Sequence, residues 1–221
     1  MTEKRGALIA IEGTDGSGKA TQVSKLKDRF GQYKIPIFTI GFPRYDTPTG
    51  KVVRAYLQGE FGDPTKIDPK LAAVLYAADR AAASDLINEC LASGTNVLCD
   101  RYIGSNLAHQ GAKLPEQDRE GFIRWNEEYE FCGLKIPIPD LTVCLHVPRE
   151  ETLRAMEKQE RQKDGHEANL DYQQKVVETY LWLARKASDW KLIDCMDGNR
   201  RKTIEEVTED AWKIIMPVLV R

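Results

Sequence analysis

The residues with the clearest chemical meaning form a glycine-rich run, GTDGSGK, over Gly13–Lys19. The run follows an apolar segment and precedes a helical one, which is the context in which the pattern G-x-x-x-x-G-K binds phosphate. Glycines let the backbone approach phosphate oxygens, successive N–H groups point inward, and the following helix adds the positive end of its dipole. Lys19 brings a mobile positive charge to the same place. The residues expected to bind a nucleotide are Gly13, Asp15, Gly16, Ser17, Gly18, Lys19, Ala20 and Thr21.

The residue after the lysine departs from this pattern. Ala20 stands where the motif normally has Ser or Thr to ligate magnesium. Thr21 lies roughly 100° further round the helix and cannot simply replace it. A magnesium ion must then rely on water, nucleotide oxygens and a carboxylate, for which Asp15 and Asp100 are the candidates.

Two arginines come soon after predicted strands. Arg101 follows the apolar segment Asn96–Asp100, and Arg44 follows the segment Ile37–Gly41 and a Phe-Pro pair. Ligands of an open α/β sheet bind at the carboxyl ends of its strands, so both arginines are expected near the phosphate loop. A guanidinium can hold an oxyanion with two N–H groups. Taken alone, Arg101 is explained equally well by a salt bridge, and Arg44 is explained better by a solvated side chain after a proline turn.

Another candidate pair lies on a predicted helix. Tyr76 and Arg80 are four residues apart and therefore share a helix face. An aromatic ring and a guanidinium on one face can stack on a nucleotide base and hydrogen bond to its edge. By itself, however, an ordinary amphipathic helix with the tyrosine in the core explains the pair better.

These residues need a scaffold that brings several strand ends together. Short apolar segments rich in β-branched residues are typical of the buried strands of a parallel sheet. They are Ala7–Glu12, Ile37–Gly41, Asn96–Asp100, Leu141–Val147 and Trp190–Asp194. The helical patterns between and after them are Lys19–Phe30, Ile67–Leu91, Leu170–Ser188 and Ile204–Ile215. The alternation predicts a three-layer α/β fold, in which helices flank a five-stranded parallel sheet.

The overall composition narrows the class of protein. The chain has 221 residues, enough for one domain with a sizeable core, and its net charge of −2 does not favour a nucleic-acid-binding surface. Its five cysteines are widely spaced and include no C-x-x-C pair, so neither a zinc site nor a disulfide framework is expected. No apolar stretch is long enough for a membrane helix or a signal peptide. These features indicate a cytoplasmic protein with reduced thiols.

Taken together, the motifs resemble those of the thymidylate kinase family over nearly the whole chain. The matching segments, in order, are Ile11–Lys19, Phe42–Arg44, Ala55–Gln58, Tyr76–Arg80, Asp100–Tyr102, Ser105 and Gly111–Lys113. The phosphate loop alone indicates only a P-loop NTPase, whereas the whole set with its spacing is far more specific. The resemblance implies a P-loop kinase fold and an ATP:dTMP phosphotransferase, which transfers the γ-phosphoryl group of ATP to dTMP in dTTP synthesis.

The resemblance also implies roles for single residues. Asp15 contacts the sugar hydroxyl of the acceptor, Arg44 holds its phosphate, and Arg101 contacts the phosphoryl groups. Tyr76, where the family usually has Phe, stacks on thymine, and Arg80 reads the edge of the base. The expected substrate-binding residues are Asp15, Phe42, Arg44, Leu57, Tyr76, Arg80, Arg101, Ser105, Asn106 and Gln110. The expected catalytic residues are Lys19, Arg101, Asp15, Arg44 and Arg161.

A charged segment, Arg149–Glu167, is either a solvated helix or a mobile lid over the active site. Family members take a transition-state arginine from the phosphate loop or from the lid, and Gly16 fills the loop position here. Arg154, Lys158 and Arg161 share a helix face. We expect Arg161 or Lys158 to reach the ATP phosphates when the lid closes. The chain is then a single domain over residues 1–221 with a lid at about residues 149–168.

Other interpretations stay open at this point. The chain could be a kinase for another pyrimidine monophosphate, dUMP or dCMP, or a non-catalytic P-loop regulator that binds nucleotide without an acceptor. Ala20 lends some weight to a degenerate member of the family. The resemblance further implies Mg²⁺ with ATP, a homodimer packed through helices, and neither a nucleic-acid nor a membrane partner.

Overall fold

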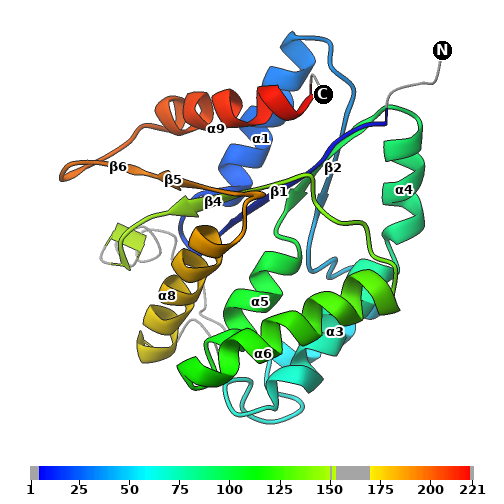
Figure 1. Ribbon diagram of the computed structural model, residues 1–221, viewed down its shortest axis with the longest axis vertical. Coiled ribbons are helices and arrows are strands. Elements are labelled where there is room, and N and C mark those ends of the chain that lie inside the picture. The colour runs from blue at the N-terminus through cyan, green and yellow to red at the C-terminus, as the bar shows by residue number, and fades with distance from the viewer. Residues whose placement is uncertain (1–4, 150, 153–169, 220–221) are drawn as a thin grey trace.

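The structure, a computed structural model, describes residues 5–149, 151–152 and 170–219 of the chain. A five-stranded parallel sheet with strand order β2-β3-β1-β4-β5 confirms the predicted strands (Figure 1). These strands are β1 (Leu8–Gly13), β2 (Ile37–Gly41), β3 (Asn96–Asp100), β4 (Leu141–His146) and β5 (Trp190–Asp194). The predicted strands Ala7–Glu12 and Leu141–Val147 are wrong by one residue, at both ends of β1 and at the last residue of β4. β1 extends to Gly13 because this glycine still pairs with Leu145 of β4.

Nine helical segments have both ends within the described part of the chain. They are α1 (Lys19–Gln32), α2 (Pro48–Leu57), α3 (Pro69–Ala81), α4 (Ser84–Ala92), α5 (Ile103–Gly111), α6 (Glu116–Glu127), the π-helical segment η1 (Glu128–Gly133), α8 (Leu170–Lys186) and α9 (Ile204–Leu219). A small antiparallel hairpin joins β6 (Met196–Asp197) and β7 (Arg200–Arg201) between β5 and α9. No described helix combines the length and the apolar character needed to cross a bilayer.

The single helix predicted over Ile67–Leu91 is wrong, because this stretch forms α3 and α4. The carboxylate of Asp68 accepts hydrogen bonds from the N–H groups of Lys70 and Leu71 and fixes the start of α3. The break between α3 and α4 contains neither glycine nor proline. It falls at Ala83, which is only 1% exposed, so burial in the core directs the turn.

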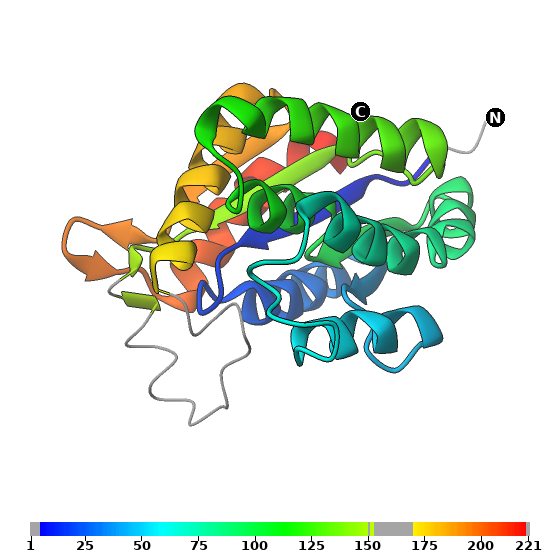
Figure 2. The same ribbon diagram turned by 90° about the horizontal axis from the view of Figure 1, so that it is seen from below.

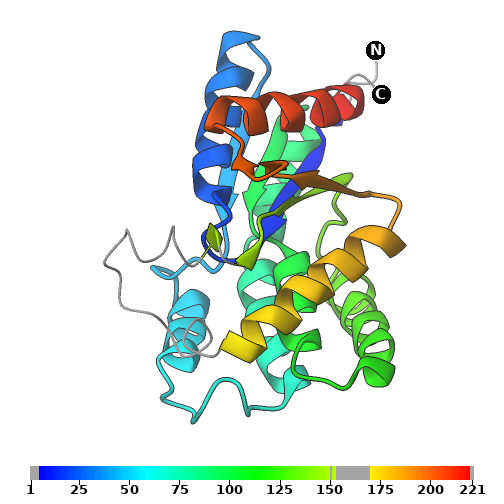
Figure 3. The ribbon, with the colours of Figure 1, turned by 90° about the vertical axis from the view of Figure 1, so that its left-hand side faces the viewer.

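Helices cover both faces of the sheet (Figure 3). α1 and α9 pack on one face, and α4, α5 and α8 pack on the other. Successive residues of β1 point to opposite faces, so Leu8 and Ala10 lie in one core while Ile9 and Ile11 lie in the other. α5 packs in turn against α6 and α8 (Figure 2). This arrangement confirms the predicted three-layer α/β fold.

The topology leaves an opening at the carboxyl ends of β1 and β3. After β1 the chain continues into α1 on one face, and after β3 it continues into α5 on the other. The two strands are neighbours, so their connections diverge and leave a crevice between them. The loop Gly13–Lys19 and the pair Asp100-Arg101 both lie at this edge. The fold therefore brings together two of the motifs singled out from the sequence.

Candidate active site

The phosphate loop joins β1 to α1 through a backbone that only glycine adopts easily. Gly13, Gly16 and Gly18 have φ angles of 141°, 76° and 96°. A Cβ atom at Gly13 would lie 2.5 Å from the carbonyl oxygen of Leu145, so any side chain there would displace β4. α1 has neither a side-chain cap nor an acidic residue in its first turn. Its first N–H groups are therefore available to an anion.

Lys19 lies under this loop and is 7% exposed. Its Nζ donates a 2.7 Å hydrogen bond to the carbonyl oxygen of Thr14. Burial, and then the nearby charge of Arg101, lower the pKa of Lys19 from 10.5 to about 8, although Asp15 raises it. The folded chain thus releases this proton near pH 8, whereas the unfolded chain keeps it to about pH 10.5. The contribution of Lys19 to the free energy of unfolding therefore increases as the pH rises from about 8 to 10.5.

Arg101 follows β3 and faces the loop. Its backbone has a φ angle of 66°, and its N–H donates a 3.0 Å hydrogen bond to Ile11, which helps to hold this unusual conformation. The guanidinium donates to the hydroxyl of Ser105 at 3.1 Å and forms an ion pair with Asp15. The structure therefore brings Arg101 and Asp15 together as expected, but as partners of one another.

Glu12 organises this corner of the site and was given no role in the sequence analysis. Its carboxylate is fully buried and accepts hydrogen bonds from the N–H groups of Tyr102 and Ser105, at 2.8 and 2.9 Å. It also accepts from the hydroxyls of Ser105 and Tyr180, at 2.6 and 3.2 Å. Gly104 is required beside it, since a Cβ there would lie 2.8 Å from the Glu12 carboxylate. A lone acid inside an apolar strand was the signal that could have revealed this residue.

A cleft of about 360 Å³ opens beside Arg101. Most of the side chains that line it were predicted to bind the substrate. Its lining residues are Asp15, Gly41, Phe42, Pro43, Tyr45, Leu57, Tyr76, Arg80, Asp100, Arg101, Tyr102, Ser105, Asn106, His109 and Gln110. Residues from β2, β3, α2, α3 and α5 thus meet around one hollow.

A buried ion pair supports one wall of the cleft. Arg80 is 2% exposed and Glu130, from η1, is fully buried. Nε and one terminal nitrogen of Arg80 each donate a 2.6 Å hydrogen bond to Glu130. The other terminal nitrogen makes only a long contact of 3.4 Å to the carbonyl oxygen of Tyr102. Glu130 therefore fixes the guanidinium and leaves one of its nitrogens for the cleft.

Asn106 and Gln110 line the same cleft as Arg80. The Asn106 amide nitrogen donates to Ala73, Asn126 and Glu130, at 3.2, 3.4 and 3.0 Å. Its oxygen is buried and accepts no hydrogen bond from the described residues. Both amide atoms of Gln110 are buried without a partner there as well. Buried polar groups normally find partners, so these atoms indicate a polar ligand in the cleft.

Arg44 is placed differently from the other predicted residues. Its neighbours Pro43 and Tyr45 line the cleft, while its own guanidinium donates to Asp79. The backbone N–H of Arg44 donates a 2.7 Å hydrogen bond to the Asp79 carboxylate. The same carboxylate also accepts hydrogen bonds from the hydroxyls of Thr47 and Thr49. Asp79 therefore anchors this segment at the edge of the cleft.

Arg161, the predicted catalytic arginine of the lid, lies outside the described residues, as do Arg154 and Lys158.

Two carboxylates at the cleft, Asp15 and Asp100, are candidate ligands for a hard divalent cation. Among the described residues, no group of three or more His, Cys, Asp or Glu side chains gathers around a common point. Asp15 is engaged by Arg101, and the carboxylate of Asp100 has no hydrogen bond or ion pair within the described ranges. A single carboxylate, with water and phosphate oxygens as the other ligands, is the kind of site that Mg²⁺ uses beside nucleotides. The residues present therefore fit Mg²⁺, with Asp100 the better placed of the two candidates.

Comparison with known proteins identifies the family. A sequence model of the family described as Thymidylate kinase matches residues 11–210. A thymidylate kinase of Mycobacterium tuberculosis is 35% identical over 83% of this chain and 87% of its own length, and that of Homo sapiens is 30% identical over 95% and 90%. The solved structure of thymidylate kinase from Candida albicans superposes with a TM-score of 0.75 at 29% identity, over 96% of this chain and 92% of its own. The chain belongs to the thymidylate kinase family.

Proposed function

We propose that the phosphate loop binds ATP, that the cleft binds dTMP, and that the γ-phosphoryl group passes directly between them to give ADP and dTDP. The observation that carries this proposal is that one cleft is lined both by Arg101 and by Arg80, Asn106 and Gln110. Lys19 lies beside Arg101, close enough for the two charges to affect one another. Donor and acceptor phosphates would meet at this pair of cations.

The polar atoms of Arg80 and Asn106 in the cleft support recognition of a thymine base. The guanidinium of Arg80 offers a free donor, and the amide oxygen of Asn106 offers a free acceptor. Thymine presents the complement, an acceptor at its C4 carbonyl and a donor at N3–H. Cytosine presents the reverse pattern at the same two positions, so it would leave buried groups unpaired. Three acceptors hold the amide nitrogen of Asn106, so the side chain cannot simply flip to suit cytosine.

The ring of Tyr76 is proposed to stack on the base. Tyr76 lines the cleft and meets the ring of Tyr56 edge to face, with centroids 6.0 Å apart. Lys113 donates a 2.8 Å hydrogen bond to the Tyr56 hydroxyl, which holds that second ring in place. A supported aromatic face is suitable for stacking on a flat base.

The arginines and carboxylates are proposed to act on the phosphates and the sugar. Arg101 exchanges its ion pair with Asp15 for the phosphoryl groups, and Asp15 is then free to accept a hydrogen bond from the sugar hydroxyl. Arg44 is proposed to hold the acceptor phosphate from its anchor on Asp79. No general base is needed, because the attacking phosphate oxygen is already anionic.

Asp100 is proposed to help hold Mg²⁺, which would neutralise negative charge on the ATP phosphates. Lys19 and the loop N–H groups then orient the donor. The lid at about residues 149–168, as part of a single domain over 1–221, is proposed to close over the nucleotides and bring Arg161 or Lys158 to the phosphates. Closure would exclude water and so limit the hydrolysis of ATP.

A coupled assay of ADP release across a panel of monophosphates tests the proposal. We expect dTMP to be the best acceptor. dUMP should be weaker by about tenfold for its missing methyl group, and dCMP weaker by about a hundredfold or more. Lys19→Ala and Arg101→Ala should abolish turnover while the far-UV circular dichroism is unchanged. Equal turnover with dCMP, ATP hydrolysis that needs no acceptor, or near-normal turnover in either variant would contradict it. Family membership does not favour the alternatives of a dUMP or dCMP kinase or a non-catalytic regulator.

We also propose a homodimer packed through helices and a cytoplasmic location. All five cysteines are free thiols, which supports a reducing compartment. Sedimentation equilibrium of the purified chain and microscopy of a tagged copy in its host would test these two points.

A further inference from the structure

The hairpin β6–β7 lies at the carboxyl edge of the sheet, just after β5 (Figure 1). Met196 pairs with Arg201 and Asp197 pairs with Arg200. No sequence motif singles out this segment. Three consecutive cations, Arg200, Arg201 and Lys202, occupy β7 and the residue after it, and Thr203 alone separates them from α9.

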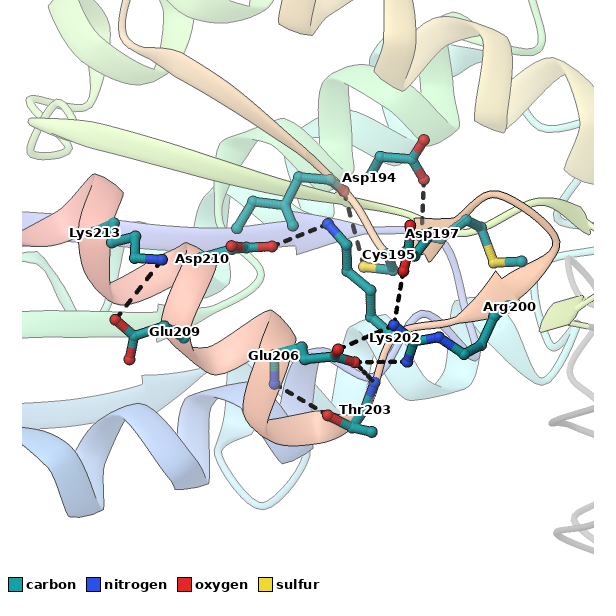
Figure 4. Close-up of polar contacts among 12 residues, drawn as sticks. Asp194, Cys195, Asp197, Arg200, Lys202, Thr203, Glu206, Glu209, Asp210 and Lys213 are labelled. Carbon is teal, nitrogen blue, oxygen red and sulfur yellow. Dashed lines mark hydrogen bonds and ion pairs between the residues drawn. The ribbon is translucent and has the colours of Figure 1, made fainter.

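Ion pairs hold the hairpin firmly to the start of α9, as Figure 4 shows. Arg200 binds Asp197 at 2.8 Å and Glu206 at 2.8 and 3.0 Å. Lys202 forms an ion pair with Asp210 at 3.0 Å, and its backbone N–H donates to Cys195 at 2.9 Å. Two of the three cations are thus neutralised by carboxylates that belong to the same corner of the protein.

Arg201, between them, is different. Its guanidinium is part-buried and donates a 3.1 Å hydrogen bond to the carbonyl oxygen of Gly16, in the phosphate loop. In the described part of the chain it has no carboxylate partner. The braced hairpin therefore delivers one unneutralised positive charge to the loop, from a point 185 residues further along the chain.

We infer that Arg201 is a positioning residue of the donor site, which holds the phosphate loop through Gly16 and so sets the affinity for the phosphates of ATP. Gly16 has a φ angle of 76°, in the left-handed region, and its carbonyl oxygen accepts the hydrogen bond from the Arg201 guanidinium. A hydrogen bond from a charged donor fixes that peptide more firmly than a neutral donor would. The inference rests on the proposed role of the loop in binding ATP.

The contact between Arg201 and Gly16 also adds a positive charge beside the phosphate loop. The loop has Gly16 and Ala20, so its only cation is Lys19, whose pKa is lowered to about 8 by burial. A guanidinium keeps its charge at any pH that the protein tolerates. Arg201 thus keeps a permanent positive charge beside the loop, and its effect should depend on the phosphates of the ligand.

Arg201→Met tests the inference, with Arg201→Lys as the conservative variant. Lys213→Met is the matched control, because it also removes one positive charge, from an exposed residue of α9. We expect Arg201→Met to raise the KM for ATP about tenfold, with less than a twofold change in the KM for dTMP. Arg201→Lys should recover part of the loss, and Lys213→Met should behave as the unchanged protein. Calorimetry should show weaker binding of ATP and unchanged binding of adenosine.

An unchanged KM for ATP in Arg201→Met would overturn the inference, as would an equal rise in the KM for dTMP or an equal loss of adenosine binding. Each result is read on variants whose Tm lies close to that of the unchanged protein. A failure of the unchanged protein to phosphorylate dTMP would instead contradict the proposed function, so the two failures are distinguishable.

Discussion

Replacing Glu130 by Gln removes the carboxylate that holds Arg80 and Asn106 at the cleft. The side chain is fully buried and accepts hydrogen bonds from Arg80, Asn106 and Asn126. Burial alone would lower the pKa of Arg80, but the charge of Glu130 and its hydrogen bonds raise it above the usual value. A guanidinium is not deprotonated in proteins, so Arg80 stays charged in both proteins, and the substitution leaves it in the interior without its counter-ion.

The expected loss of stability follows from that unpaired charge. Removing one partner of a buried ion pair costs about 3–5 kcal/mol, because the other charge stays buried. For a chain of this size, such a loss lowers Tm by about 6–20 °C. The KM for dTMP should rise in the same variant, since Arg80 and Asn106 lose the group that orients them toward the cleft.

Urea denaturation of four proteins measures this effect: the unchanged chain, Glu130→Gln, Arg80→Met, and the double variant Arg80→Met/Glu130→Leu. The double variant should be more stable than either single variant, because it buries no unpaired charge. The surface pair of Lys186 and Glu120, both more than half exposed, provides the control. Glu120→Gln should change the stability by less than about 1 kcal/mol. A Glu130→Gln variant within about 1 kcal/mol of the unchanged protein would refute the reasoning.

Three further predictions concern the site itself. ATP binding at about pH 8 to 9 should take up protons, because phosphate restores the charge of Lys19, whose pKa is about 8. Calorimetry in buffers of different ionisation enthalpy measures this proton uptake. Lys19→Met should abolish it. Glu12→Gln should lower kcat at least about tenfold, because two N–H groups and two hydroxyls donate to this carboxylate, and one of those hydroxyls, from Ser105, positions Arg101. An unchanged kcat would show that the network is only structural. Asn106→Leu should raise the KM for dTMP about tenfold or more and leave the KM for ATP unchanged in steady-state kinetics.

The sheet could be predicted closely because its strands are short, apolar and buried on both faces. β2, β3 and β5 begin and end where the hydrophobic runs do. The helices were harder to predict, since α5 and α6 carry polar residues toward the cleft or solvent and their apolar pattern is weak. α2 did carry a local signal that was missed: Thr47 caps it by accepting from the N–H of Gly50, and Pro48 occupies its first turn.

The site was predictable where a motif names a residue, and unpredictable where a partner is distant in sequence. The cleft gathers Asp15, Tyr76 and Asn106 as the motifs suggested. Nothing local indicates that Glu130 pairs with Arg80, fifty residues earlier, or that Arg201 reaches the phosphate loop. Such long-range pairs depend on how the helices pack, and packing is set by the whole chain.

The central claim is that the two nucleotides meet phosphate to phosphate between Lys19 and Arg101. An adenosine and a thymidine joined through a polyphosphate bridge would occupy both sites in one molecule. We predict that this compound inhibits the enzyme competitively against ATP and also against dTMP, and that it binds far more tightly than either nucleotide alone. Competition with ATP but not with dTMP would show that the cleft does not hold the acceptor in line with the donor, and would contradict the account.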